Sequence, residues 1–361
     1  MHEYKPGKQP KISDNSIVKL NTNENPYPPL PQIIKAAKKF SFEKFRKYPD
    51  PNQTNLRKIA AKTLSKEFHL AKSKYLSTEN IFFSNGSDEI LNALLRTFVD
   101  PKQIVTFPNI TYNAYASYTA MYGIRSQKIK LKDFRISLDQ HKKAIEKSRL
   151  FFLANPNAPT GQALSPDEIK KALKTHPSTL FVVDEAYGDF KKDFSLIPFV
   201  NDFENLIVVR TFSKSASLAG ARIGYALAKP NIIRALRKTL DPYNLNSFSQ
   251  HIAEASFSCY GEIMKVCLKI SKERERVKKE LEKRKFNVLP SFANFLYTSP
   301  PPKKGKKSKE NALFWLSFLE KNKIYVRHFD FGALPESGYL RITIGTALEN
   351  KALFRCIDQK S

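Results

Sequence analysis

Residues 180–214 read LFVVDEAYGDFKKDFSLIPFVNDFENLIVVRTFSK and contain two short apolar runs, Leu180–Val183 and Leu206–Val209. A run of four apolar, largely β-branched residues bounded by polar chain predicts a strand that is buried on both faces. The chain between the two runs is long enough for a crossover connection. We therefore expect two parallel strands of one sheet.

Similar runs occur upstream, at Ile81–Phe83, Gln103–Phe107 and Arg149–Leu153. Between the runs, helical periodicity predicts helices over Asp88–Phe98 and Pro166–Lys174. Alternation of strand and helix is typical of an α/β fold, in which helices flank a mostly parallel central sheet. We place this large domain at residues 31–243.

A different pattern begins near residue 244. A charged amphipathic stretch covers residues 248–285, and Trp315 marks a helix among later strand candidates at Asn294–Tyr297, Lys323–Val326 and Tyr339–Ile344. This pattern predicts a smaller α+β domain over residues 244–361. The Pro- and Asn-rich residues 1–30 are expected to form an arm that packs on the small domain or on a partner, or else a binding loop.

Composition narrows the class of protein. Apolar residues make up 41% of the 361 residues and aromatic residues 12%, which is not the composition of a disordered chain. The three cysteines form no CxxC pair and the six histidines are scattered, so we predict neither a disulfide framework nor a metal site. Because the sequence shows no signal peptide and no long apolar run, we expect a soluble, cytoplasmic protein.

The chain is strongly basic, with 61 Lys and Arg against 34 Asp and Glu and a net charge of +27. Such a surface attracts nucleic acids, anionic lipids and phosphorylated metabolites alike. No nucleic-acid-binding motif is present and the charge is spread along the chain, so we predict no specific nucleic-acid partner and no membrane partner. The run at 300–309, PPPKKGKKSK, is interpreted as a solvated loop, and a Lys-rich genome would also produce this composition.

Chemically useful side chains follow the predicted strands. Asp184 and Lys214 come after two strands about one βαβ unit apart, so they are expected at the same edge of the sheet, where ligands bind in such folds. A simple salt bridge between them is the alternative. Ser213 and Arg222 flank Lys214 among small residues, and they would supply hydrogen bonds and a bidentate fork for a phosphate.

Two loops add polar groups. In SNGSDE, residues 84–89, the amides of Ser87 and Asp88 begin a predicted helix and would face an anion on the helix axis, although both residues are also ordinary N-caps. The loop ANPNAPTG, residues 154–161, carries the side-chain amides of Asn155 and Asn157, although most such loops are only turns.

Together these groups match the requirements of pyridoxal phosphate. A lysine such as Lys214 condenses with the cofactor aldehyde and moves a proton. A carboxylate such as Asp184 keeps the pyridine nitrogen protonated, which makes the ring an electron sink. A phenol such as that of Tyr187 stabilises the negative charge on the ring oxygen.

The motifs LNTNENPYP, KYPDP, NGSDE, NPNAPTG, VVDEAY, TFSKSASLAGARIGY and LRITIGT follow one another between residues 20 and 346. They resemble the fold-type I pyridoxal-phosphate transferases, and most closely the histidinol-phosphate aminotransferase family. The resemblance implies that Lys214, Asp184 and Tyr187 are catalytic. It also implies a set of cofactor contacts: Ser87, Asp88, Tyr112, Asn157, Asp184, Tyr187, Ser213, Lys214 and Arg222. Tyr112 would stack on the ring, with core packing as its alternative.

The sequence departs from the family at one position. The family loop has asparagine directly before PTG, where it donates to the ring hydroxyl, and this chain has Ala158. Either Asn157 or Asn155 takes over this contact, or Tyr187 acts alone. We expect Asn157 to contact both cofactor and substrate.

The resemblance also implies the substrate contacts. Arg341 would bind the anionic group of the substrate, a carboxylate or a phosphate, and Tyr27 and Arg327 favour a phosphate, although Arg327 is alternatively a surface residue. The implied reaction moves the amino group between L-histidinol phosphate and 2-oxoglutarate in histidine biosynthesis. Aromatic amino-acid aminotransferase and threonine-phosphate decarboxylase are the alternatives. Tyr48 is expected to reach the cofactor phosphate of the partner subunit in a homodimer.

Overall fold

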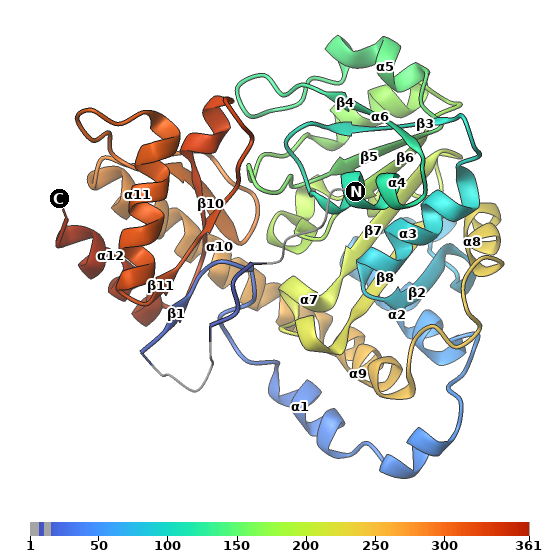
Figure 1. Ribbon diagram of the computed structural model, residues 1–361. Coiled ribbons are helices and arrows are strands. Elements are labelled where there is room, and N and C mark those ends of the chain that lie inside the picture. Colours follow the sequence, from blue (N-terminus) through green and yellow to red (C-terminus); the bar gives the residue numbers. More distant parts are fainter. Residues whose placement is uncertain (1–6, 11–15, 361) are drawn as a thin grey trace.

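A seven-stranded sheet forms the centre of the larger unit in the computed structural model, which describes residues 7–10 and 16–360 (Figure 1). The strand order is β2-β8-β7-β6-β5-β3-β4. The strands are β2 (Ile81–Asn85), β3 (Ile104–Pro108), β4 (Arg125–Ile129), β5 (Leu150–Ala154), β6 (Leu180–Asp184), β7 (Leu206–Thr211) and β8 (Ile223–Ala228). Only β8 runs antiparallel to its neighbours β2 and β7, so the predicted mostly parallel sheet is confirmed.

Two strands of this sheet were not predicted. β4 is an edge strand with the polar sequence RSQKI, which shows no apolar run. β8 follows the small residues after Lys214, a segment that we interpreted only as a ligand-binding stretch. Its antiparallel direction brings Gly224 beside Thr211, at the end of β7.

Helices cover both faces of the sheet, as predicted. Alternate residues of the strands pack on α3 (Ser87–Phe98), α4 (Ala114–Met121) and α8 (Pro230–Arg237) on one face. The other residues face a core that includes α2 (Thr54–Glu67), α6 (Pro166–Thr175) and α9 (Ser247–Ser258). Because both faces are covered, the central strands are apolar along their whole length.

The smaller unit contains an antiparallel sheet in the order β12-β13-β10-β9. Its strands are β12 (Arg327–His328), β13 (Leu340–Thr343), β10 (Phe295–Ser299) and β9 (Asn287–Val288), and its helices are α11 (Ser308–Lys321) and α12 (Ala347–Asp358). Two predicted strands appear as β10 and β13, and Trp315 is buried in α11. The strand predicted at 323–326 is β11 (Ile324–Tyr325), which lies in a separate two-stranded sheet.

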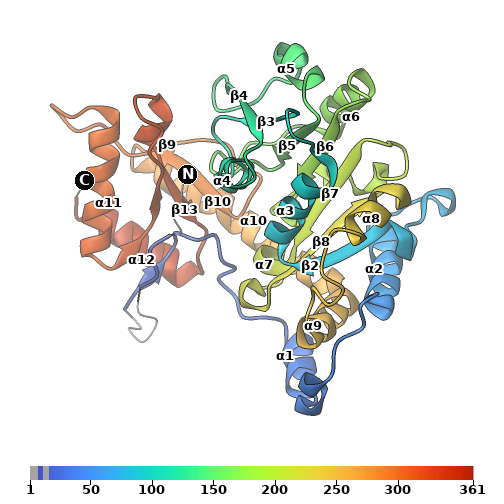
Figure 2. The same cartoon turned by 45° about the vertical axis from the view of Figure 1, so that its right-hand side comes forward.

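The predicted amphipathic stretch at 248–285 forms two helices, because the backbone leaves the helical conformation at Cys259. The first of them, α9, packs against α2 and against α1 (Pro31–Lys38) of the large unit. The second, α10 (Tyr260–Lys283), runs from the large unit to the small one (Figure 2). Dividing the chain at residue 243 would therefore separate α9 from its packing partners, and we propose that the units join along α10.

The described part of the predicted arm connects the two units. β1 (Val18–Lys19) pairs in parallel with β11, and the chain then runs past the end of β7 to α1 (Figure 1, blue). On the way, the Asn25 side chain donates to the backbone oxygens of Lys214 and Ser215, at 3.2 and 2.9 Å. Residues 1–6 and 11–15 of the predicted arm lie outside the described residues.

Within the ranges described, no helix is both long enough and apolar enough to span a membrane.

Candidate active site

A cavity of about 270 Å³ lies where the ends of β6 and β7 meet the arm and β13. Most of the predicted site residues line it: Ser87, Asp88, Tyr112, Asp184, Tyr187, Ser213, Lys214, Arg222, Arg327 and Arg341. Three predicted residues, Tyr27, Tyr48 and Asn157, are not among its lining residues. The structure thus brings together side chains from strand ends more than 250 positions apart in the sequence.

Lys214 lies on the short helix α7 (Phe212–Ser215), directly after β7. The Thr211 hydroxyl caps this helix by accepting from the amide of Ser213 at 3.1 Å, which fixes the turn. The Lys214 Nζ donates to the backbone oxygen of Thr22 at 3.1 Å. Loss of hydration, and next the charge of Arg341, lower the pKa of Lys214 to about 8. An amine of this pKa is neutral more often than a surface lysine, so it is a better nucleophile and base.

Asp184 ends β6 and is buried. Its carboxylate accepts from the Tyr115 hydroxyl at 2.7 Å and from the Ala186 amide at 3.1 Å. Burial raises the pKa of Asp184 to about 6, and among the described residues no cation forms a salt bridge with it. An unpaired buried carboxylate costs free energy, so this position favours a ligand that brings a positive charge.

We expect Asp184→Asn to stabilise the cofactor-free protein in a pH-dependent way. The folded chain holds the Asp184 proton up to about pH 6, above the ordinary 3.8, so this stabilisation is present below pH 4 and is lost as the pH rises to 6. The neutral amide has no such loss. In urea unfolding, the advantage of the variant should grow by about 2 kcal/mol between pH 4.5 and 7.5.

The exposed Asp139→Asn variant is the control, because this carboxylate is paired with lysines at the surface. An equal gain in both variants, or a constant difference across the pH range for Asp184→Asn, would contradict the role of burial.

The start of α3 and the loop after α7 form a cradle. Gly86 has a φ of +86°, and a Cβ on it would lie 2.6 Å from the Arg222 guanidinium. A Cβ on Gly224 would lie 2.3 Å from the amide nitrogen of Ser87. Arg222 also contacts the Asp88 carboxylate at 3.3 Å. Backbone amides at a helix start beside an arginine fit a phosphate, and glycine at these two positions lets Arg222 and the start of α3 pack this closely.

Tyr112 donates its hydroxyl proton to the Asp88 carboxylate at 2.9 Å, and its ring meets the Tyr115 ring edge-on. The hydrogen bond holds the Tyr112 ring at the cavity wall. Tyr187 stands in the same cavity, and its hydroxyl accepts from the Asn23 side chain at 2.9 Å. Burial raises the pKa of the Tyr187 phenol, so it keeps its proton at neutral pH.

The structure does not place Asn157 among the residues that line the cavity. Both amide hydrogens of Asn157 are used within the loops, on the Ile110 carbonyl and the Thr160 hydroxyl, at 3.0 Å each. The Asn155 amide bonds to the backbone of Leu164. Ala158 instead lines the cavity. Both asparagines thus bond within the protein, and Tyr187 is the candidate from our predictions that lines the cavity.

Arg327 and Arg341 are directly opposite each other on β12 and β13. Both guanidinium groups lie near the Phe329 ring, at 5.4 and 5.0 Å from its centre. Arg341 also donates to the Asn21 carbonyl at 2.9 Å. Like charges directly opposite on neighbouring strands repel, and an anion between them removes the repulsion. The pair therefore fits a ligand group with two negative charges.

Two predicted residues lie elsewhere. The Lys269 ammonium lies 4.1 Å from the centre of the Tyr27 ring, outside the cavity walls. The Tyr48 side chain is 81% exposed and stacks on Tyr243, with ring centres 4.4 Å apart.

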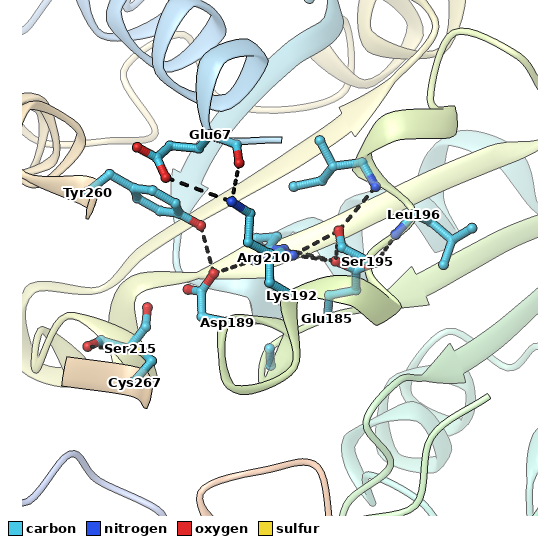
Figure 3. Close-up of polar contacts among 12 residues, drawn as sticks. Glu67, Glu185, Asp189, Lys192, Ser195, Leu196, Arg210, Ser215, Tyr260 and Cys267 are labelled. Carbon is cyan, nitrogen blue, oxygen red and sulfur yellow. Dashed lines mark hydrogen bonds and ion pairs between the residues drawn. The ribbon is translucent and has the colours of Figure 1, made fainter. Parts of the chain in front are cut away.

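No role was predicted from the sequence for a buried ionic cluster around Arg210 (Figure 3). Arg210, at 1% exposure, pairs with Glu185 at 2.7 Å and with Asp189, which also accepts from the Tyr260 hydroxyl at 2.6 Å. Glu185 follows Asp184 directly, and Arg210 is four residues before Lys214. The Arg210 cluster thus ties the ends of β6 and β7 together. The sequence feature that could have predicted this cluster is the charged residue at the end of each apolar run, Glu185 after the first and Arg210 after the second.

The comparisons with known proteins agree with this geometry. The model of the class I and II aminotransferase family matches residues 15–357. Histidinol-phosphate aminotransferase of Acinetobacter baylyi is 37% identical over 360 residues, covering 98% of this chain and 93% of the relative. The enzyme of the same name from Lactococcus lactis subsp. cremoris is also 37% identical, covering 99% and 94%.

A solved structure, histidinol-phosphate aminotransferase from Sinorhizobium meliloti in complex with pyridoxal 5'-phosphate, has a TM-score of 0.83 at 25% identity, covering 95% of this chain and 92% of that one. The chain therefore belongs to the class I and II aminotransferases, which are pyridoxal-phosphate-dependent transaminases with the fold predicted from the sequence. Within that class, the relatives named above are histidinol-phosphate aminotransferases.

The residues of the cavity fit pyridoxal phosphate. The cradle around Gly86 offers the Arg222 guanidinium and the backbone amides at the start of α3 to a phosphate, Lys214 offers an amine, and the Asp184 carboxylate, which has no cationic partner among the described residues, favours a protonated ring nitrogen.

Proposed function

We propose that this transaminase moves the amino group between L-histidinol phosphate and 2-oxoglutarate, a step of histidine biosynthesis. The observation that carries the proposal is the facing pair of Arg327 and Arg341 at the cavity. An amino acid with one carboxylate needs one guanidinium group, whereas a phosphate dianion matches two. The names of the curated relatives support the same substrate.

The mechanism follows from the proposed roles of the chain's own residues. Bound pyridoxal phosphate supplies an electron sink that makes the α-proton of the substrate acidic. The Lys214 Nζ, whose pKa is lowered to about 8, would take this proton from the α-carbon of the substrate and deliver it to the cofactor carbon that bears the amino group. Asp184 keeps the ring nitrogen protonated, Tyr187 donates to the ring oxygen, and Ser213, Arg222 and the amides of Ser87 and Asp88 hold the cofactor phosphate.

The test is an assay of amino transfer to 2-oxoglutarate with L-histidinol phosphate, L-phenylalanine and L-threonine phosphate as separate substrates. We expect the highest kcat/KM with histidinol phosphate. A higher value with phenylalanine would favour the aromatic amino-acid aminotransferase, and release of carbon dioxide from threonine phosphate would favour the decarboxylase.

The matching variant is Arg327→Met. It should lower kcat/KM for histidinol phosphate by about 10²-fold, because it removes one partner of a desolvated ion pair. With L-histidinol, which has no phosphate, the variant and the unsubstituted enzyme should differ by less than about threefold. An equal loss with both substrates would contradict the phosphate role of Arg327.

We also propose a homodimer in which Tyr48 reaches the cofactor phosphate of the partner subunit. Four aromatic side chains of the segment 42–48 and of residue 243 are exposed, and such a patch is typical of an interface. They are Phe42 (82%), Tyr48 (81%), Phe45 (56%) and Tyr243 (44%). A monomer in sedimentation experiments on the holoenzyme would contradict this.

We also propose a cytoplasmic location. The support for it is that the three cysteines are free and buried, as is typical of proteins in a reducing compartment.

A further inference from the structure

We infer that Asn23, on the arm, is a positioning residue that directs the hydroxyl proton of Tyr187 toward the ring oxygen of the cofactor. The inference rests on the transaminase chemistry and not on which substrate is transferred. It concerns the direction of hydrogen bonds, and three contacts fix that direction.

The first contact has no ambiguity. The backbone amide of Asn23 donates to the Thr343 hydroxyl oxygen at 3.0 Å, because a backbone N–H can only donate a hydrogen bond and cannot accept one. The Thr343 hydroxyl also lies 3.0 Å from the Asn23 side-chain oxygen. The Thr343 hydroxyl thus accepts from the Asn23 amide and donates its single proton to the Asn23 side-chain oxygen.

The contact with Tyr187 follows from the geometry of the Asn23 side-chain amide, whose oxygen and nitrogen point in different directions. With its oxygen held by Thr343, Asn23 presents its NH₂ group to Tyr187, and the nitrogen lies 2.9 Å from the Tyr187 hydroxyl. The hydroxyl therefore accepts from Asn23. A phenol has one proton to donate, so Tyr187 keeps that proton for another acceptor.

Asn23 is held firmly in this orientation. Its side chain is 1% exposed, and its backbone oxygen accepts from Asn294 at 3.0 Å. The Tyr187 ring is fixed by edge-on contact with Phe295, at 5.1 Å between centres. The direction of the hydrogen bonds is thus set by buried groups of the arm and the small sheet.

Position 158 makes this arrangement important. In the loop before PTG, the chain has Ala158, whose side chain has no hydrogen to donate to the ring oxygen, and Asn155 and Asn157 are both engaged elsewhere. The Tyr187 proton is then the donor that remains for this oxygen. If the proton pointed to Asn23 instead, the negative charge on the ring oxygen would lose its hydrogen bond.

Charged groups on several elements also face Tyr187. Arg341 on β13 favours negative charge on the phenol, whereas Asp184 on β6 and Asp88 on α3 oppose it. Lys214 lines the same cavity. A test must separate the hydrogen-bond direction from a change in charge.

The decisive variant is Asn23→Asp, measured by titrating the visible absorbance of the bound cofactor with pH. A carboxylate accepts from both Thr343 and Tyr187, so it reverses the direction of the second bond. We expect the apparent pKa of the absorbance change to rise by about one to two pH units. We also expect kcat to fall about 10- to 100-fold with little change in KM.

Three further variants control this experiment. Thr343→Val adds no charge and removes the hydroxyl that holds the Asn23 side-chain oxygen. The Asn23 side-chain amide can then rotate by about 180°, so the variant should raise the same pKa by a smaller amount. In a Tyr187→Phe background, Asn23→Asp should shift the pKa less than it does in the unsubstituted enzyme. Asn294→Ala removes a contact to the Asn23 backbone without changing hydrogen-bond direction, so it should shift the titration much less than Asn23→Asp does.

The result that supports the inference is a shift that depends on Tyr187, together with rescue of Asn23→Asp by Ala158→Asn, which restores a second donor. Equal shifts with and without the Tyr187 hydroxyl would show a charge effect and overturn it. A shift in Asn294→Ala as large as that in Asn23→Asp would show general loosening and would also overturn it. If Asn23→Asp does not fold, an unshifted titration of Thr343→Val is sufficient to reject it.

Discussion

Lys214→Ala is expected to lower kcat/KM by at least about 10⁴-fold, because it removes the amine that we propose both bonds to the cofactor and transfers the α-proton. No neighbouring group can replace it. Among the described side chains that line the cavity it is the only amine, and its Nζ donates to the backbone oxygen of Thr22 on the arm. The purified variant should also lack the visible absorbance band that depends on this lysine.

Lys171→Ala, at an exposed ion pair with Asp139, provides the control and should keep full activity. A Lys214→Ala protein that retained more than about one hundredth of the activity would contradict the assignment of the catalytic base. Melting temperatures of both variants would separate loss of chemistry from loss of folding.

Arg210→Met should lower the free energy of unfolding by about 3–5 kcal/mol. The substitution leaves Glu185 and Asp189 without their cationic partner in a site from which water is excluded, and burial already raises the pKa of Glu185. The Tyr260 hydroxyl and Ser195 supply hydrogen bonds but no charge. Urea unfolding of the two proteins at pH 7.5 measures the difference.

An exposed arginine pair is the matched comparison. Arg135 bonds Glu168 at 2.8 Å with half of the arginine side chain exposed, and Arg135→Met should cost less than about 1 kcal/mol. Similar losses in the two variants would mean that the Arg210 cluster is worth no more than a surface ion pair.

Most of the fold could be predicted from the sequence because its central strands are apolar on both faces. The runs at β5, β6 and β7 are bounded by polar residues, so periodicity identified them within one or two positions. β4 was missed because an edge strand exposed to water need not be apolar. The break at Cys259 was missed although Ser258, Tyr260 and Gly261 beside it are poor helix formers, because the charged amphipathic pattern was taken as one continuous stretch.

The site was predictable where a residue lies at the end of a strand, as Asp184 and Lys214 do. It was not predictable where the contact depends on distant chain. The Asn157 amide is used by Ile110 and Thr160, and the Ile110 partner is 47 residues away. Arg327 lies opposite Arg341 only in this register of β12 and β13, and a shift of one residue would place them on different faces of the sheet. The contact of Asn23 with Tyr187 was not predictable because the two residues are 164 positions apart and no sequence pattern links them.

The arm has a consequence for how the enzyme is made. The partners of β1 and of Asn23 are β11 and Thr343, which leave the ribosome more than 300 positions after the arm. Pairing over more than 300 positions is slow and cannot begin until β11 has been synthesised. A growing chain can therefore complete the large sheet while its catalytic cavity still lacks one wall, and a prematurely terminated product that ends before β11 has no partner for its first strand.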